Sequence, residues 1–244
     1  MLARALLALG SLIRRQATRL VFLGQLPQRQ RSLRPGLAMG VGTSSGRTRT
    51  LYATLLADAR FHELLLTIDR ELADACRAEG CETCGGRLHS ACYPRKPHGR
   101  PESLRRRLGP EHDRRFSFCC AVDGCRSRET PPSVRFLGRR IFIAGVVVLI
   151  AVLRDCVTDS RLQRLSAIVR VDRRTVERWR RWWRETFTAT PFWQVARAQF
   201  MPPVAHACLP GSLLDRFAGD AADNLVAALR FLGPITGGAG MQAR

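Results

Sequence analysis

The motif Cys81-x-x-Cys84-Gly85-Gly86 constrains this chain of 244 residues more than any other feature of its sequence. Two thiols three residues apart, in a turn followed by glycine, can reach one metal ion together. The glycines let the backbone fold back so that its N–H groups face the sulfurs. A C-x-x-C motif alone is also typical of a redox pair, but that chemistry needs a strand before the motif and a helix after it. Here a helical pattern precedes the motif and a Gly-rich loop follows it, which favours a metal site.

A site built from thiolates needs a second close pair of cysteines, and Cys119, Cys120 and Cys125 supply it. The residues before them alternate as in a strand, which places Cys120 on one face with Phe118 and favours it over Cys119. The sequence therefore predicts a structural zinc site with four ligands: Cys81, Cys84, Cys120 and Cys125.

Other ligand sets stay open. His89, Cys92 and His98 lie between the two pairs and compete with them, and four cysteines without any metal are a further alternative. Four thiolates close the coordination sphere and leave no position for substrate water. A zinc ion held in this way would stabilise the fold and perform no chemistry.

Charge indicates the class of partner. Lys and Arg number 40 against 20 Asp and Glu, a net charge of +20, which points to nucleic acid or an acidic membrane surface. Residues 1–50 contain nine arginines and no acid, and we expect a disordered or mistranslated basic leader there. Residues 51–244 still carry a net +11. The longest uncharged apolar run, Ile141–Leu153, is too short to span a membrane, so we do not expect a membrane partner.

Residues 162–183 have the pattern of a helix-turn-helix. The apolar phase shifts between Val169 and Val171, as a tight turn between two crossing helices requires, and Asp172 can cap the second helix. Trp179 and Trp183 have the spacing of core residues. The alternative is a solvated basic helix on a helical bundle.

The second of these helices has an arginine-rich outward face. In a helix-turn-helix this face enters the major groove, where arginine binds guanine with two hydrogen bonds and a carboxylate accepts from cytosine. We therefore predict that it binds double-stranded DNA through Arg173, Arg174, Glu177, Arg178 and Arg181.

Together these patterns predict a mainly α fold with a small zinc-ribbon β insertion and a helix-turn-helix bundle. An N-terminal helix over 51–80 would have Asp58 as its N-cap and Gly80 as its stop, with one apolar face and acids and arginines on the other. Its predicted core residues are Phe61, Leu65, Ile68, Leu72 and Ala75. The zinc-ribbon-like module would cover 81–139, the helix-turn-helix 140–188, and short helices broken at Pro202-Pro203 and Gly219-Asp220 the rest, 189–244.

Three segments in order carry a resemblance: CETCGGRL, RFSFCCAVDGCRSRETPPSVRFLGRR and RTVERWRRWWRETF. Over residues 80–188 the chain resembles the zinc-ribbon plus helix-turn-helix DNA-binding region of bacterial insertion-element transposases and of the small regulatory proteins encoded beside them. The resemblance implies that the helix from Arg173 reads an element end or a promoter. It also implies a bacterial, cytoplasmic, nucleoid-associated protein that works with a transposase encoded nearby.

The resemblance does not extend to catalysis. Transposases of this kind carry an acidic triad on a ribonuclease-H-like domain, and only 56 residues follow Thr188. Asp215, Asp220 and Asp223 lie there on short helical segments, with no strands to align them for two metal ions. We therefore expect no enzyme and no small-molecule substrate, but an accessory protein or transcriptional regulator of a mobile element. The alternatives are the DNA-binding subunit of a split transposase or nuclease, and a basic protein of the membrane surface.

Overall fold

The computed structural model describes residues 52, 54–95, 104, 107–137, 141–152, 163 and 172–237. These residues are mostly helical, with small antiparallel sheets, as the sequence predicts. The predictions for the leader 1–50 and for His98 lie outside the described residues, and so do those for the first helix and the turn of the helix-turn-helix, apart from Gln163.

The longest described helix is α3, Ala59–Glu79, and both of its predicted ends are confirmed. The side chain of Asp58 accepts a hydrogen bond from the N–H of Arg60, and Gly80 ends the helix with φ +77°, a conformation that favours glycine. Of the predicted core face, Phe61, Leu65 and Ile68 are buried, and Leu72 is half-buried. The prediction was wrong for Ala75, which is exposed because the buried face continues through Ala73 instead.

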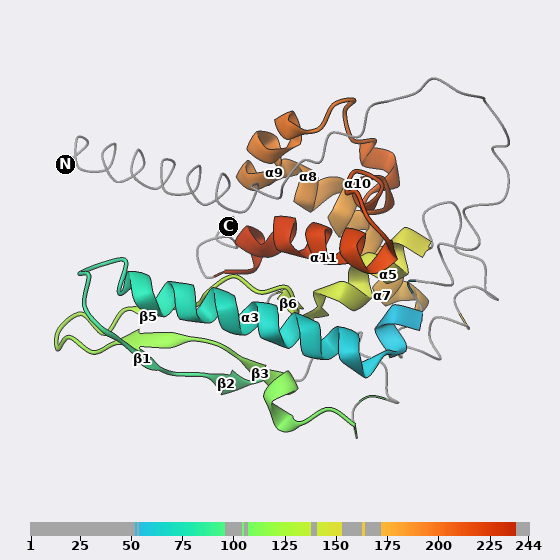
Figure 1. The fold of residues 1–244 in the computed structure, drawn as a ribbon. Helices are drawn as coiled ribbons and strands as arrows, with labels where there is room; N and C mark the ends of the chain where they lie inside the picture. Colours follow the sequence, from blue (N-terminus) through green and yellow to red (C-terminus); the bar gives the residue numbers. More distant parts are fainter. Residues whose placement is uncertain are drawn as a thin grey trace, which may run out of the picture. The chain divides into compact units, whose positions relative to one another are not determined.

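The two halves of α3 pack on different parts of the molecule (Figure 1). Its first half joins the large hydrophobic core through Phe61, Leu65 and Ile68. Its last turns pack through Ala73 and Cys76 on a separate small cluster that contains Leu88 and Phe118. One helix therefore supports two cores.

The small cluster belongs to what we call the cysteine module, residues 81–95 and 107–129. Its main sheet has three antiparallel strands in the order β1 (Leu88–Ser90), β4 (Phe118–Cys120) and β5 (Arg128–Glu129). A second antiparallel pair is formed by β2 (Tyr93–Pro94) and β3 (Arg114–Arg115). The short 3-10 helix η1 (Pro110–Asp113) directly precedes β3.

A hairpin of β6 (Phe136–Leu137) and β7 (Ile141–Phe142) leads from the module into α5 (Ile143–Val152). The apolar run that begins at Ile141 forms α5 from Ile143 onward, but its first two residues form a strand, because they pair with β6.

The helical body, residues 141–152 and 172–237, contains most of the large core. Its longest segment is continuous from α7 (Arg173–Arg181) through a π turn (Trp182–Thr186) to α8 (Phe187–Ala189). The predicted core residues Trp179 and Trp183 are buried in it, together with Phe187. In α7 the Asp172 side chain accepts from the N–H of Thr175, 2.6 Å away, which confirms the predicted cap.

Short helices close the body, and the two predicted breaks between them are confirmed. The described elements after α8 are α9 (Pro191–Ala196), η3 (Arg197–Gln199), η4 (His206–Cys208), α10 (Gly211–Leu214), α11 (Ala221–Leu232) and η5 (Gly233–Thr236).

A buried ion pair lies between the two cores. Asp69 of α3 was expected on the polar face, but it is 1% exposed, and its carboxylate accepts from Arg135 Nε at 2.7 Å. The same carboxylate accepts from the hydroxyl of Ser133 and the N–H of Val134. Arg135 in turn donates to three backbone carbonyls of the module, those of Glu111, His112 and Arg114. The pair therefore ties α3 to the segment just before β6 and, through Arg135, to the backbone around η1 and β3.

Candidate metal centre and arginine helix

Four cysteine sulfurs converge at one end of the cysteine module. The sulfurs of Cys81, Cys84, Cys120 and Cys125 all lie within 4.8 Å of one another, and all four thiols are free. The sulfurs of Cys84 and Cys120 lie 3.4 Å apart, and those of Cys81 and Cys125 lie 3.7 Å apart. These are the four cysteines that the sequence singles out, and as a set they could hold a metal ion.

Each cysteine pair lies in a turn closed by backbone hydrogen bonds. In the first turn the N–H of Cys81 donates to the carbonyl of Gly86, and the N–H of Gly85 donates to the carbonyl of Cys81. In the second turn the N–H of Cys120 donates to the carbonyl of Ser127. The two turns present their sulfurs to each other across the end of the sheet.

Gly86 is required by the close approach of the two turns. A Cβ atom at this position would lie 2.4 Å from Val122 Cγ2 and within 3.2 to 3.3 Å of the sulfurs of Cys84 and Cys120. In the second turn Gly124 has φ +84°, and Arg126 adopts φ +44°, which is strained for a residue with a side chain.

Side chains also join the two turns. The carboxylate of Glu129 accepts from the N–H of Glu82 at 3.1 Å, and its Oε1 lies 3.9 Å from the sulfur of Cys81. The hydroxyl of Thr83 donates to that of Ser127 at 3.1 Å. The sulfur cluster is therefore held by contacts outside the cysteines themselves.

Cys81 gives up its proton more readily than an ordinary thiol. Burial raises its pKa, but hydrogen bonds from the N–H groups of Cys84 and Thr83 and from the Cys125 and Cys120 thiols bring the pKa down to about 7. Its thiolate is thus available as a ligand near neutral pH.

The other three thiols hold their protons more tightly. An N–H group of a following residue favours each thiolate, but burial and hydrogen bonding with neighbouring thiols raise all three pKa values. Four thiols at this distance cannot all ionise alone, because like charges repel. A divalent cation would replace their protons and remove this repulsion.

The other candidate ligands near the cysteine pairs, His89, Cys92 and Cys119, do not join the cluster. His89 and Cys119 are cross-strand partners, and their alternation places them on the opposite face of the sheet from Cys120. The sulfur of Cys92 lies beside the hydroxyl of Ser90 at 3.3 Å. No other group of three or more possible ligands occurs in the part of the chain that the structure describes.

The helix α7 presents the predicted arginine face to solvent. The buried side chains of Val176, Trp179 and Trp183 form one stripe of the helix. The residues predicted to read DNA are all exposed on the remaining surface: Arg173, Arg174, Glu177, Arg178 and Arg181. Within it, Arg173 Nε donates to Glu177 Oε1 at 3.0 Å, an exposed i,i+4 pair.

The acids that were considered for catalysis have structural contacts. Asp220 and Asp223 form a reciprocal capping box at the start of α11, in which each side chain accepts from the backbone of the other residue. Asp215 directly follows α10.

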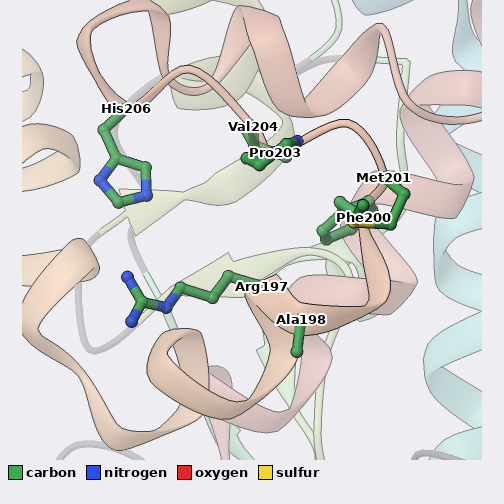
Figure 2. Close-up of a pocket in the computed structure, with 7 residues that line it drawn as sticks. All are labelled: Arg197, Ala198, Phe200, Met201, Pro203, Val204 and His206. Carbon is green, nitrogen blue, oxygen red and sulfur yellow. The ribbon is translucent and has the colours of Figure 1, made fainter.

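A pocket of about 430 Å³ lies in the helical body between η3 and η4. Figure 2 shows apolar side chains of Phe200, Met201 and Val204 around it, with Arg197 and His206 on one side. His206 Nε2 accepts from the indole N–H of buried Trp193 at 3.2 Å. This pocket contains neither the cysteines nor the arginines of α7.

Comparisons with family models, with curated proteins and with solved structures found no match to this chain. The four-cysteine cluster among small antiparallel strands suggests a zinc-binding knuckle or ribbon, and no family is identified. None of the helices in the described residues has the length and hydrophobicity to cross a membrane.

Proposed function

We propose that this chain is a zinc-stabilised protein that binds double-stranded DNA and reads its sequence with the arginine face of α7. The observation that carries the proposal is this face itself, which stands opposite a stripe of buried aromatic side chains. The core packing fixes the helix orientation, so that Arg174, Arg178 and Arg181 point away from the body. Arginines spaced along one helix face can contact successive bases and phosphates in a major groove.

The charge of the helix supports a polyanionic partner. In α7 and the π turn, exposed arginines outnumber the exposed acids Glu177 and Glu185. The exposed ion pair of Arg173 with Glu177 stabilises the helix by only about 0.5 kcal/mol. The excess of arginine leaves this surface with a net positive charge, which favours an anionic partner.

Zinc is the metal that the sulfur cluster fits best. A tetrahedral ion with zinc–sulfur bonds of about 2.3 Å holds its sulfurs about 3.8 Å apart. The sulfur separations of 3.4 and 3.7 Å are close to this value. With four thiolates the ion has no open position, so its role is to stabilise the module, and we propose no catalysis at this site.

In this proposal the protein is a non-catalytic accessory or transcriptional regulator of a mobile element. The order of the cysteine pairs and α7 along the chain supports it, as does the resemblance of these segments to insertion-element proteins. The proposed protein partner is a transposase encoded by a neighbouring gene.

The test is selection from random DNA duplexes with the full chain folded with zinc, at physiological salt. We expect one enriched motif for the wild type. The variant Arg178→Ala should relax the motif at one position, since a lost base contact costs about 1 to 3 kcal/mol of discrimination. The matched control Arg60→Ala changes an exposed arginine on α3 and should leave the motif unchanged. Enrichment of no motif, or equal effects of both variants, would overturn the proposal.

A further inference from the structure

The three-stranded sheet of the cysteine module has a second face that the metal cluster does not use. Its register places Leu88, Phe118 and Cys120 on the face toward α3, where they are buried. Alternation then places His89, Cys119 and Arg128 in one row on the outer face, because His89 pairs with Cys119 and Cys119 with Arg128. His89 and Arg128 are exposed, and Cys119 is half-buried between them.

Two further arginines border this row. The N–H of Ala121 donates to the carbonyl of Arg87, so the ladder continues by one residue and Arg87 lies on the same face as His89. The sulfur of Cys119 lies 3.7 Å from the carbonyl oxygen of Arg126, which places the backbone of Arg126 over the outer face. Both arginines are exposed. We call the four side chains of Arg87, His89, Arg126 and Arg128 the outer basic face.

The basic side chains of this face lie on neighbouring strand positions without a carboxylate in the row. By ordinary strand geometry the backbone positions of Arg87 and His89 are about 6.6 Å apart along the first strand. Arg128 lies two strands over from His89, at a backbone distance of about 9.6 Å. Glu129 is paired with Phe118 and belongs to the other face. Asp123 pairs with Arg126 at 2.8 Å, but both side chains are largely exposed, at 92% and 66%, so the pair is weak and open to exchange.

The conformation of Arg126 is a separate observation. Its φ of +44° is one that glycine adopts without strain, and Arg126 is the only described residue other than glycine with a positive φ. The turn therefore holds an arginine where glycine would stabilise it more. An arginine at a strained position supports the hypothesis that its side chain acts in binding and not in folding.

We propose that the outer basic face is a second contact surface for double-stranded DNA, and that its three arginines bind backbone phosphates without reading bases. This inference rests on the proposed function, since it assigns a second surface to the same partner. Phosphate contacts add affinity and salt dependence, and they carry no sequence information directly. In this proposal the outer basic face adds affinity for the duplex, and α7 recognises its sequence.

The test uses the zinc-loaded full chain and a short DNA duplex of arbitrary sequence, titrated at several salt concentrations. The double variant Arg87→Gln/Arg128→Gln should bind more weakly. Its slope of log affinity against log salt should be less negative by about 0.9 for each arginine lost. Arg60→Gln on α3 is the matched control and should leave the slope unchanged. Equal zinc content shows that the variants are folded.

Arg126→Gly separates binding from folding. Glycine relieves the strained φ, so the melting temperature should rise, while duplex affinity should fall because a phosphate contact is lost. A purely structural role of Arg126 would leave duplex affinity unchanged. Asp123→Asn removes the competing carboxylate and should strengthen duplex binding.

The outcomes distinguish this inference from the proposed function. If Arg87→Gln/Arg128→Gln binds duplex as the wild type does, while Arg178→Ala still relaxes the selected motif, the outer basic face is not a contact surface and the proposed function stands. If the face variants weaken binding and Arg178→Ala changes nothing, the face holds DNA and the proposed role of α7 fails. No duplex binding by the wild type would overturn both.

Discussion

The cysteine module and the helical body are stabilised in different ways. The body buries large side chains such as Trp183, Trp193 and Phe187 in a continuous core. The module's cluster is much smaller. Its buried residues are Ala73 of α3 and four residues of the module: Cys81, Leu88, Phe118 and Cys120. Its strands are only two or three residues long. So small a core offsets little of the conformational entropy of its loops, and a metal ion bound by the four cysteines would add the stability that the core lacks.

The two surfaces proposed for DNA differ in how firmly their side chains are positioned. The arginines of α7 stand on a helix whose orientation the large core fixes, which suits the recognition of particular bases. The outer basic face lies on short strands beside the four-cysteine cluster. Phosphate contacts tolerate more positional freedom than base contacts, because any phosphate offers the same charge.

The largest expected effect is the loss of the module's fold, with the body left folded, when one proposed metal ligand is removed. Cys81→Ser should abolish stoichiometric zinc binding and the fold of the module, since zinc sites of this kind contribute about 10 kcal/mol or more to folding. Zinc content by atomic emission and thermal unfolding by circular dichroism measure this. Cys208→Ser changes an exposed free thiol of the body and should alter neither.

The next effect tests the buried contact that joins α3 to the cysteine module. Asp69→Ala leaves the buried guanidinium of Arg135 without its counter-charge, which should destabilise the chain by about 3 to 5 kcal/mol. Urea unfolding measures the change. The control is Glu71→Ala, which breaks an exposed pair with Arg230 at 3.6 Å and should cost no more than about 1 kcal/mol. Similar losses in the two variants would contradict the role of the buried pair.

A smaller effect should be confined to the metal site. Gly86→Ala places a methyl group against Val122 and two ligand sulfurs, which should weaken zinc binding by about 1 to 3 kcal/mol. Competition with a chelator of known affinity measures this. Gly124→Ala meets no atom within 4 Å, and although its φ is strained, it should weaken zinc binding less than Gly86→Ala does. The reverse order would show that the two turns do not approach as described.

The smallest effect should stay within the body. Asp172→Ala removes the cap of α7 and should lower stability by about 1 kcal/mol, with unchanged zinc affinity. Asp220→Ala at the start of α11 is the matched case and should behave alike. Weaker zinc binding in either variant would mean that the body and the metal site are coupled more tightly than the comparison implies.

Local signals explain which features could be predicted from the sequence. Asp58 and Gly80 mark the ends of α3 because capping depends only on neighbouring backbone groups. Strand alternation placed Cys120 toward the first cysteine pair and Cys119 away from it, and the described sulfur cluster agrees. The exposed face of α7 follows from helical periodicity in the same way.

The features that the sequence did not predict depend on distant residues. Asp69 has the polarity of a surface residue, and its burial requires Arg135, which is 66 residues away. Ile141 and Phe142 continue a helical apolar run, but pairing with Phe136 and Leu137 makes them a strand. The outer basic face was missed because it needs the register of three strands, which no single segment specifies.

The most direct test of the account is hydrogen exchange of the full chain with zinc and after chelation. α3 reports on both parts, because its first half packs on the large core and its end packs on the cysteine cluster. After chelation we expect the amides of β1, β4 and the last turns of α3 to lose protection. Those of α7, α11 and the first half of α3 should keep it. Simultaneous loss of protection in all of these elements, or continued protection of the strands without metal, would contradict the account.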